Sequence, residues 1–364
     1  MATLGSFEWY YLFPIILTVV ALFKFRSKRT GVLIFFILFF FNVFRGDGVG
    51  NDTMNYISWD RIQYLGGSYE TEFTGIADLG SNYELITIWM NRIVYMLNLH
   101  PRWIITMYSL ITYIFLWIAF KKFRVNIAFA SIFYVLLNLY FFSLSAARQM
   151  AAVSVILYAY SFLFENEKRK SIYFFVWGII ASLIHVSSIF VLFIFPVKYL
   201  MLSRRLQIGI TIAISSVFVL LAINPLSAIY NILGLEYIGR YVGEFDLGER
   251  SLIGRLFSFI QLIFFYYFFT VRNNKTKADL YDNLFCIAVL FYSLFSSSSI
   301  LIGRIGFYFS IFSCIYLSTV TYQNYNSSKN YRIIFILYAI FSIYDIGAMG
   351  ANGAYINGYY FNFM

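Results

Sequence analysis

Residues 31–56 read GVLIFFILFFFNVFRGDGVGNDTMNY, an apolar run that passes directly into a segment with one arginine, two aspartates and three glycines. Apolar runs of roughly 14 to 20 residues recur along the 364-residue chain, and a bilayer core is crossed by about 20 apolar residues. The chain is 61% hydrophobic and 22% aromatic, with a mean hydropathy of +0.73. This pattern predicts an all-α, polytopic membrane protein.

We predict a single transmembrane domain, residues 1–364, with about twelve spans and a range of about 10 to 14. The predicted spans are residues 7–23, 31–44, 102–120, 125–142, 148–164, 171–184, 186–200, 206–223, 252–271, 280–297, 301–320 and 331–345. Three segments are predicted outside: a loop at 45–101 with an amphipathic, non-crossing helix at 82–99, a loop at 224–251, and the tail 346–364.

Basic residues set the predicted orientation. If the N-terminus lies outside, every second loop is cytoplasmic and carries a basic cluster, as the positive-inside rule requires. These clusters are Lys24/Arg26/Lys28/Arg29, Lys121/Lys122/Arg124, Lys168/Arg169/Lys170, Lys198/Arg204/Arg205, Arg272/Lys275/Lys277 and Lys329/Arg332. This order holds only if the chain turns back at His185.

The formal charge of +10 does not indicate nucleic acid, because these clusters are short and separate the apolar runs. Cys286 and Cys314 lie within apolar runs and have no metal-ligand or disulfide spacing. We therefore expect no nucleic-acid partner, no zinc site and no cofactor. A metal is not required for the function suggested below, because arginines can take its electrostatic role, although the carboxylates on the predicted outer side leave metal binding open.

All ten lysines fall on the predicted inner side, whereas the nine basic residues on the outer side are all arginines. Guanidinium grips two oxygens of a phosphate or carboxylate together and keeps its charge. Charged groups at membrane depth usually face a protein-lined cavity. The outer arginines nearest the membrane therefore suggest a lipid-linked phosphate or pyrophosphate bound from outside. The alternative for each is a neighbouring carboxylate, such as Asp47 for Arg45, or snorkelling to headgroups.

Two further features point to the same outer surface. Gly46, Gly48 and Gly50 allow backbone conformations closed to other residues, and Asp47 or Asp52 could act as a base beside an anion. The alternative is a capped, solvated turn. His185 lies between arms of about 14 to 15 residues, too short for a full crossing, so its turn is expected below the outer surface. A recessed imidazole could serve as a base or could simply bond a backbone carbonyl.

Four motifs occur in a fixed order along the chain. They are Arg45-Gly46-Asp47 through Asp52 and Tyr56; Arg148-Gln149 with Ala151 and Ala152; His185 with Ser187 and Ser188; and Arg304 with Gly306 and Tyr308. In this order the chain resembles the EpsG-like branch of the Wzy-type bacterial polysaccharide polymerases, which make O-antigen, capsule or exopolysaccharide. Two aspartates, Asp47 and Asp52, compete for the position of the family's acid.

The resemblance implies a glycosyltransferase-C-like membrane fold in the bacterial cytoplasmic (inner) membrane, with the active site facing outward. It implies a glycosyltransferase that moves a glycan from undecaprenyl diphosphate to the non-reducing end of another lipid-linked unit. Donor and acceptor oligosaccharides, membrane lipid, a flippase and a chain-length regulator are the implied partners.

The site residues expected from motifs and resemblance fall into two groups. The catalytic group is Asp52, His185, Arg148 and Arg304, with Asp52 favoured as base over Asp47 and His185. The group expected to bind substrate or pyrophosphate is Arg45, Asp47, Tyr56, Gln149, Ser187, Arg250 and Arg255. Preplaced arginines would stabilise the charge that develops on the leaving diphosphate.

Other classes of membrane protein have the same apolar composition and are considered as alternatives. A flippase or transporter for the same lipid-linked sugar would be expected to have charged or broken helices at the membrane midplane and inverted repeats. An outer-face ligase would be expected to have a larger second outer loop than residues 224–250. An acyltransferase would be expected to use a histidine in an early span, and this chain has none there.

Overall fold

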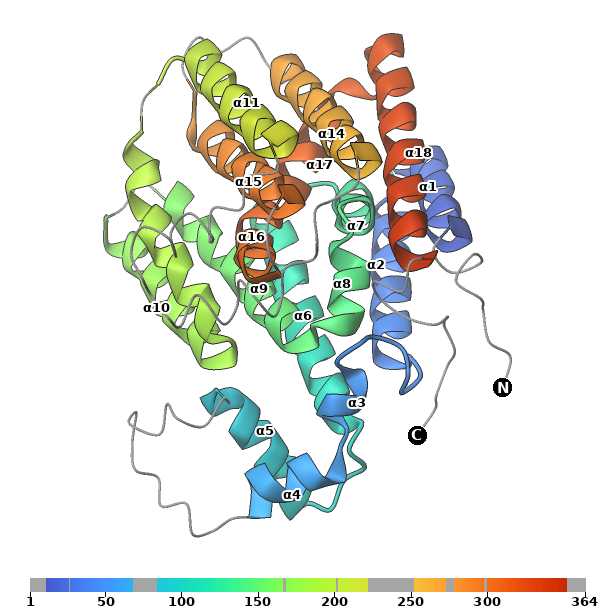
Figure 1. Ribbon diagram of the computed structural model, residues 1–364, viewed down its shortest axis with the longest axis vertical. Coiled ribbons are helices and arrows are strands. Elements are labelled where there is room, and N and C mark those ends of the chain that lie inside the picture. Colours follow the sequence, from blue (N-terminus) through green and yellow to red (C-terminus); the bar gives the residue numbers. More distant parts are fainter. Residues whose placement is uncertain are drawn as a thin grey trace. The chain divides into compact units, whose positions relative to one another are not determined.

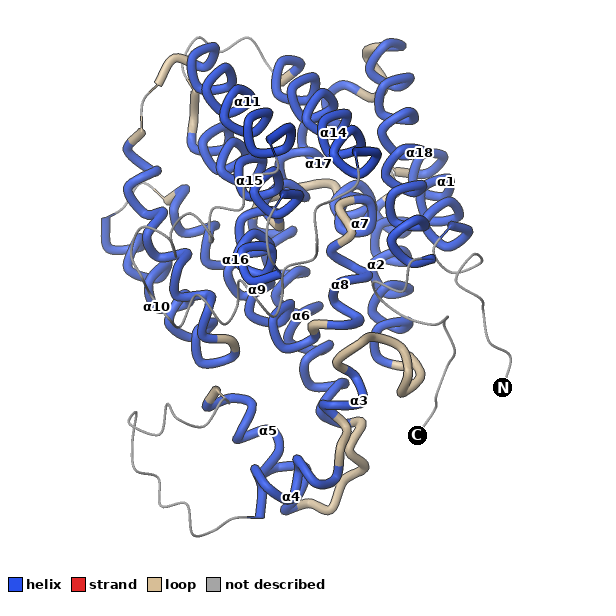
Figure 2. The backbone as a smooth tube through the Cα atoms, in the orientation of Figure 1, coloured by secondary structure: helices blue, strands red, loops and turns tan. Residues whose placement is uncertain are grey.

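The computed structural model describes residues 11–25, 27–67, 84–165, 168–200, 202–221, 252–272, 278–297 and 300–351, apart from side chains at a few helix ends. Within these ranges the chain forms helices joined by short turns and contains no strand, as the tube in Figure 2 shows. The all-helical prediction is therefore confirmed. The chain divides into two compact units, 1–189 with 342–364, and 190–341.

The first unit is built from helices of very different length. Its elements are α1 (Phe13–Lys24), α2 (Lys28–Val43), α3 (Thr53–Tyr56), α4 (Trp59–Gly67), α5 (Leu85–Met96), α6 (Trp103–Lys122), α7 (Ile127–Leu136), α8 (Leu139–Ser145), α9 (Ala147–Tyr160), η3 (Ser161–Phe164) and α10 (Lys168–Ile184). Helix α9 packs between α6 and α10, α7 packs on α1 and α2, and α4 packs on α5 (Figure 1).

The second unit follows the 3₁₀ helix η4 (Val186–Tyr199), which crosses the boundary between the units. Its elements are α11 (Arg204–Leu221), α14 (Leu252–Val271), α15 (Leu280–Ser297), α16 (Ile300–Ser310), α17 (Phe312–Asn324) and most of α18 (Lys329–Ala351). Helix α15 contacts α11, α14, α16 and α17, so it is the centre of this unit.

The described part of each predicted span is largely helical, but fewer helices meet the length of a full crossing. Four described helices are long and apolar enough: Trp103–Lys122, Ala147–Phe164, Ile305–Asn324 and Lys329–Ala348. The bent pair α7 and α8 is a fifth if it crosses as one broken span, with a bend of 65°. The membrane character is thus supported, and the count of about twelve stays a prediction.

Exposed apolar side chains agree with a membrane environment. Phe23 is 83% exposed, Phe193 78% and Ile340 60%, although each is a large hydrophobic residue in a helix. In water such surfaces would favour aggregation or association, whereas in a bilayer they contact lipid tails. The polar side chains described below are instead turned inward.

Contacts between loops agree with the predicted sides of the membrane. The Asn51 amide donates to Ser145 Oγ at 3.3 Å, which joins two segments predicted to lie outside. Asn126 Nδ2 donates to the Phe25 carbonyl at 2.9 Å, which joins two segments predicted to lie inside. In the second unit, the Ala278 amide donates to the Leu202 carbonyl at 3.3 Å, again between two predicted inner loops.

Candidate functional site

Glu84 brings Arg148 and His185 together in the first unit. Arg148 Nη1 donates to Glu84 Oε2 at 2.7 Å, and His185 Nδ1 lies 3.3 Å from the other carboxylate oxygen, Oε1. The Val186 amide also donates to Oε1, at 3.3 Å. These partners lie 64 to 102 residues from Glu84 along the chain. One carboxylate therefore joins three segments that the sequence keeps far apart.

Each of the three side chains is placed by the end of a helix. Glu84 occupies the position before α5 with an extended backbone, where the positive end of the helix dipole favours a carboxylate. Arg148 is the second residue of α9. His185 directly follows the last residue of α10, and its amide still donates to the Ala181 carbonyl at 2.9 Å. Helix α10 therefore ends directly before His185, and the predicted turn back across the membrane at this residue stays a prediction.

The cluster is mostly buried but retains access. The side chains of Arg148, His185 and Glu84 are 20%, 14% and 11% exposed. Burial raises the pKa of the Glu84 carboxyl, but the neighbouring His185 and the Arg148 guanidinium lower the pKa more, so the net value lies below the usual one. Glu84 is accordingly a carboxylate at neutral pH.

A tyrosine pair lies beside this cluster. Thr87, one turn into α5, shares a buried hydrogen bond of 2.8 Å with the Tyr108 hydroxyl. The Tyr56 ring lies 5.8 Å from the Tyr108 ring, and the Arg61 guanidinium lies 5.4 Å from the centre of Tyr56. The predicted binding residue Tyr56 thus sits next to a residue that packs on α5.

Asp52 and Tyr56 are both electrostatic neighbours of Arg148. Asp52 is partly exposed and precedes α3, although its side chain makes no capping hydrogen bond there. Two predicted site residues of the first outer loop therefore lie within electrostatic range of Arg148.

Arg45 has a different environment from the one its sequence position suggested. Its side chain is fully buried, and Nη1 donates to the backbone carbonyl and the side-chain oxygen of Asn42 at 2.7 and 2.8 Å. Its Nε donates to Thr53 Oγ1 at 3.4 Å. These contacts close the 45–53 loop onto the end of α2, and they favour a structural role for Arg45.

Asp47 forms an ion pair with Arg102. Arg102, which is 3% exposed, also donates to the Arg45 carbonyl. The Asp47 carboxylate, which the sequence offered as a possible partner of Arg45, therefore has Arg102 as an ion-pair partner. It also means that Asp47 faces a cation that is already inside the protein, whereas Asp52 lies toward Arg148.

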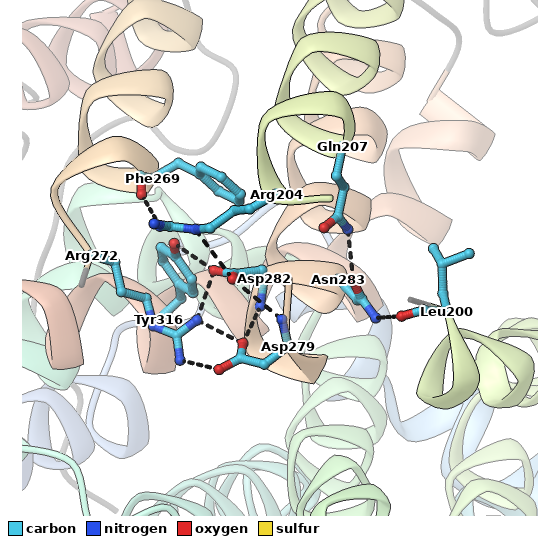
Figure 3. A network of polar contacts seen from close by, with 9 residues as sticks. All are labelled: Leu200, Arg204, Gln207, Phe269, Arg272, Asp279, Asp282, Asn283 and Tyr316. Carbon is cyan, nitrogen blue, oxygen red and sulfur yellow. Dashed lines mark hydrogen bonds and ion pairs between the residues drawn. The ribbon is translucent and has the colours of Figure 1, made fainter. Parts of the chain in front are cut away.

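A second polar network lies in the other unit and has a buried centre. Arg272 Nη1 bonds Asp279 and Asp282 at 2.7 Å each, and Arg204 Nε lies 3.3 Å from Asp282 (Figure 3). Beside it, Gln207 donates to Asn283, which donates in turn to the carbonyls of Val197 and Leu200. Asp282 is 1% exposed. Two arginines and two aspartates satisfy one another, so this network acts as a structural clamp.

The remaining predicted site residues are less completely defined. Arg250 and the side chain of Arg304 lie outside the described residues, although the Arg304 backbone belongs to α16. Arg255 is partly exposed in α14. Gln149 is 2% exposed, and Ser187 is in the first turn of η4. Among the described residues, no group of His, Cys, Asp or Glu could hold a metal.

Glu84 was not among the predicted site residues. The sequence marked it only as one polar residue of the amphipathic segment 82–99. Its position could have served as a signal. Glu84 directly precedes the apolar helix Leu85–Met96 and lies on the predicted outer side, where every basic residue is an arginine. Such an acid either faces solvent or meets an arginine from another helix.

Comparison with known proteins gives one match. A model described as the EpsG family matches residues 28–361, which cover almost the whole chain. No curated protein and no solved structure matches.

Proposed function

The chain belongs to the EpsG family, and from that we propose that it is a polysaccharide polymerase acting on lipid-linked repeat units. In this proposal it transfers the growing glycan from undecaprenyl diphosphate to the non-reducing end of an incoming unit, at the outer face of the bacterial cytoplasmic membrane. The observation that carries the proposal is the cluster of Arg148, Glu84 and His185, which joins two residues singled out by sequence motif.

The proposed chemistry needs two properties, and the cluster supports both. The acceptor hydroxyl must lose a proton as its oxygen bonds to the anomeric carbon, and the bond from that carbon to the diphosphate must break with its electrons leaving on oxygen. Arg148 supplies a fixed cation for the developing charge on the diphosphate. His185 supplies a base within the same cluster.

Burial and pairing help to rank the candidate residues. Arg148 is 20% exposed, so a diphosphate can reach it, whereas Arg45 is fully buried. Asp47 is engaged with Arg102, which leaves Asp52 and His185 as the acceptor-side candidates. Arg250 and Arg304 remain proposed partners of the diphosphate on the basis of their motifs.

The direct test is polymer formation by the purified protein in lipid nanodiscs. The substrate is the lipid-linked repeat unit extracted from a source strain that lacks this gene, and the product is a ladder of lengths on a gel. We expect the wild-type protein to form the ladder and Arg148→Lys to lose at least about 100-fold in rate, because ammonium does not reproduce bidentate contact. A matched control is Arg92→Lys, an outer arginine stacked on Trp89 at 5.8 Å, which should keep its rate.

Two results would overturn the proposal. One is a wild-type protein that makes no ladder from this substrate while it still moves the units across a bilayer, as a flippase would. The other is a deletion strain that accumulates long chains on the undecaprenyl carrier, as a ligase defect would. A polymerase defect leaves single repeat units on the final acceptor.

A further inference from the structure

The Glu84 carboxylate uses its two oxygens for two different partners. Oε2 accepts from Arg148, and Oε1 faces His185 Nδ1 and accepts from the Val186 amide. An ordinary structural ion pair needs only one of these contacts. This division means that any movement of Glu84 changes the positions of the guanidinium and the imidazole together.

The two nitrogens of the His185 ring have unequal surroundings. Nδ1 is buried and lies 3.3 Å from Glu84 Oε1, an ion-pair distance without the geometry of a hydrogen bond. Nε2 has no hydrogen-bond partner among the described residues, and the side chain keeps 14% of its surface exposed. A carboxylate next to Nδ1 favours the tautomer with the proton on that nitrogen, which leaves the Nε2 lone pair free.

We propose that Glu84 is a positioning residue that fixes His185 as a base through Nε2 and holds Arg148 at the diphosphate in the same step. This inference rests on the proposed polymerase function. The acceptor O–H proton moves to Nε2, the acceptor oxygen bonds the anomeric carbon, and the leaving diphosphate keeps the electron pair of the broken bond. Glu84 stabilises the His185 imidazolium until solvent takes the proton from the imidazolium. The Glu84 carboxylate itself is not protonated.

Helix α5 transmits this positioning. Thr87 and Asn91, on the face below Glu84, are fully buried, and Thr87 is bonded to Tyr108 of α6. Asn91 Nδ2 donates to the Thr87 carbonyl at 2.7 Å. The first turns of α5 are therefore held rigidly, as a residue that sets catalytic geometry requires.

The first test is the pH dependence of kcat/KM in the nanodisc assay. Among the described residues, the charged and titratable groups around His185 are Glu84, directly before α5, and Arg148 of α9. Asp52, Tyr56 and Tyr108 lie within electrostatic range of Arg148. Among the described residues, Glu84 is the carboxylate in contact with the imidazole, and Glu84→Gln removes its charge. We expect the acidic limb of the profile to move to lower pH, with the maximal rate reduced about 100-fold.

Two variants separate positioning from folding. Glu84→Asp keeps the charge but is one methylene shorter, so it cannot bridge both partners, and we expect a lower rate with normal protein yield. Glu165→Gln is the matched control, because it removes a carboxylate from a surface pair with Lys170 at 3.5 Å. It should change neither rate nor pH profile.

The second test reads the tautomer directly. The chain has two histidines, so His100→Asn leaves His185 alone for ¹⁵N-histidine solid-state NMR. We expect an Nδ1–H, Nε2-unprotonated signal at high pH in the His100→Asn protein. In the double variant with Glu84→Gln, the two tautomers should become mixed.

The outcomes distinguish this inference from the proposed function. A wild-type protein without polymerase activity rejects the function, whereas the NMR result still tests the Glu84 contact. An active wild type together with a Glu84→Gln variant whose pH profile and tautomer are unchanged rejects the positioning role alone.

Discussion

Gly50 is the residue in the first outer loop whose backbone most clearly requires glycine. Its φ is +96°, a region that residues with a Cβ rarely adopt. A Cβ at this position would lie 2.6 Å from the Leu144 carbonyl carbon and 2.8 Å from Thr53 Oγ1. The glycine thus allows the loop to touch the backbone at the end of α8. Of the three glycines 46, 48 and 50, Gly50 therefore has a defined structural reason.

Gly50→Ala should lower the free energy of unfolding by about 2 to 4 kcal/mol, through backbone strain and the clash with Leu144. The measurement is thermal unfolding of the detergent-solubilised protein followed by intrinsic fluorescence. Gly209→Ala is the control, because a Cβ there meets nothing within 4 Å and the site is inside α11. It should be neutral or stabilise by up to about 1 kcal/mol. Equal effects of the two substitutions would contradict this account.

The lowered pKa of Glu84 predicts that its contribution to the free energy of unfolding depends on pH. Its folded pKa lies below the ordinary 4.5, so its contacts stabilise the folded chain above that value and are lost as pH falls through the lowered pKa. Wild type should unfold at a higher temperature than Glu84→Gln at pH 7, and this difference should shrink on acidification below about pH 4.5. A difference that stays constant down to pH 3 would show that the carboxylate charge contributes nothing.

At the scale of elements, the polar clamp of the second unit joins α11, α14, α15 and α17. Asp282, near the start of α15, bonds Arg272 and Arg204 and accepts from the Tyr316 hydroxyl at 3.2 Å. Asp279 lies one turn earlier and is 29% exposed. The network therefore has a buried centre and a more exposed edge.

Asp282→Asn should destabilise the second unit by about 3 to 5 kcal/mol, because it leaves buried arginines without their compensating charge. Asp279→Asn should cost less, about 1 to 2 kcal/mol, since solvent screens its partly exposed pair. Thermal unfolding of both variants checks this order. The reverse order, or no loss for either, would mean that the clamp is not a source of stability.

The sequence predicts the helices well and their breaks poorly. Apolar length located the long described helices but not α3 and α4, which lie in the predicted outer loop 45–101. Residues 125–142 contain neither Gly nor Pro and were predicted as one continuous span. The structure breaks this segment at Leu137 and Asn138, and Asn138 has a φ of +65°. Asparagine tolerates this conformation. The composition of residues 125–142 predicts an apolar helical segment, whereas the position of its bend depends on packing against neighbouring helices such as α6 and α9.

At the scale of the whole molecule, the candidate site shows the same limit to what local sequence can predict. Motifs pointed to Arg148 and His185 because their residue types suit anion binding and proton transfer. They did not point to Glu84, since its role depends on contacts across 64 and about 100 residues of chain, which no local pattern encodes. Conversely, Arg45 had the right type and position for a ligand, but it is fully buried, and Asn42 and Thr53 accept from its Nη1 and Nε.

The predicted orientation of the chain can be tested by labelling. Within each unit, contacts join segments predicted on the same side of the membrane, so one position in each unit reports on that unit's orientation. Gln63 in α4 and Ser327, between α17 and α18, are exposed and lie on opposite predicted sides. The native Cys286 and Cys314 are buried and free, so they give little background.

In intact cells with a permeable outer layer, a membrane-impermeant maleimide should label Gln63→Cys and leave Ser327→Cys unlabelled until the inner membrane is permeabilised. The physical basis is the inward attraction of lysine and arginine clusters such as Lys24 to Arg29 and Lys329 with Arg332. Labelling of Ser327→Cys alone would invert the chain and place the Arg148 cluster at the cytoplasmic face. The cluster would then be unable to reach lipid-linked units that a flippase has already moved to the outer face. An inverted topology would therefore also exclude the proposed reaction.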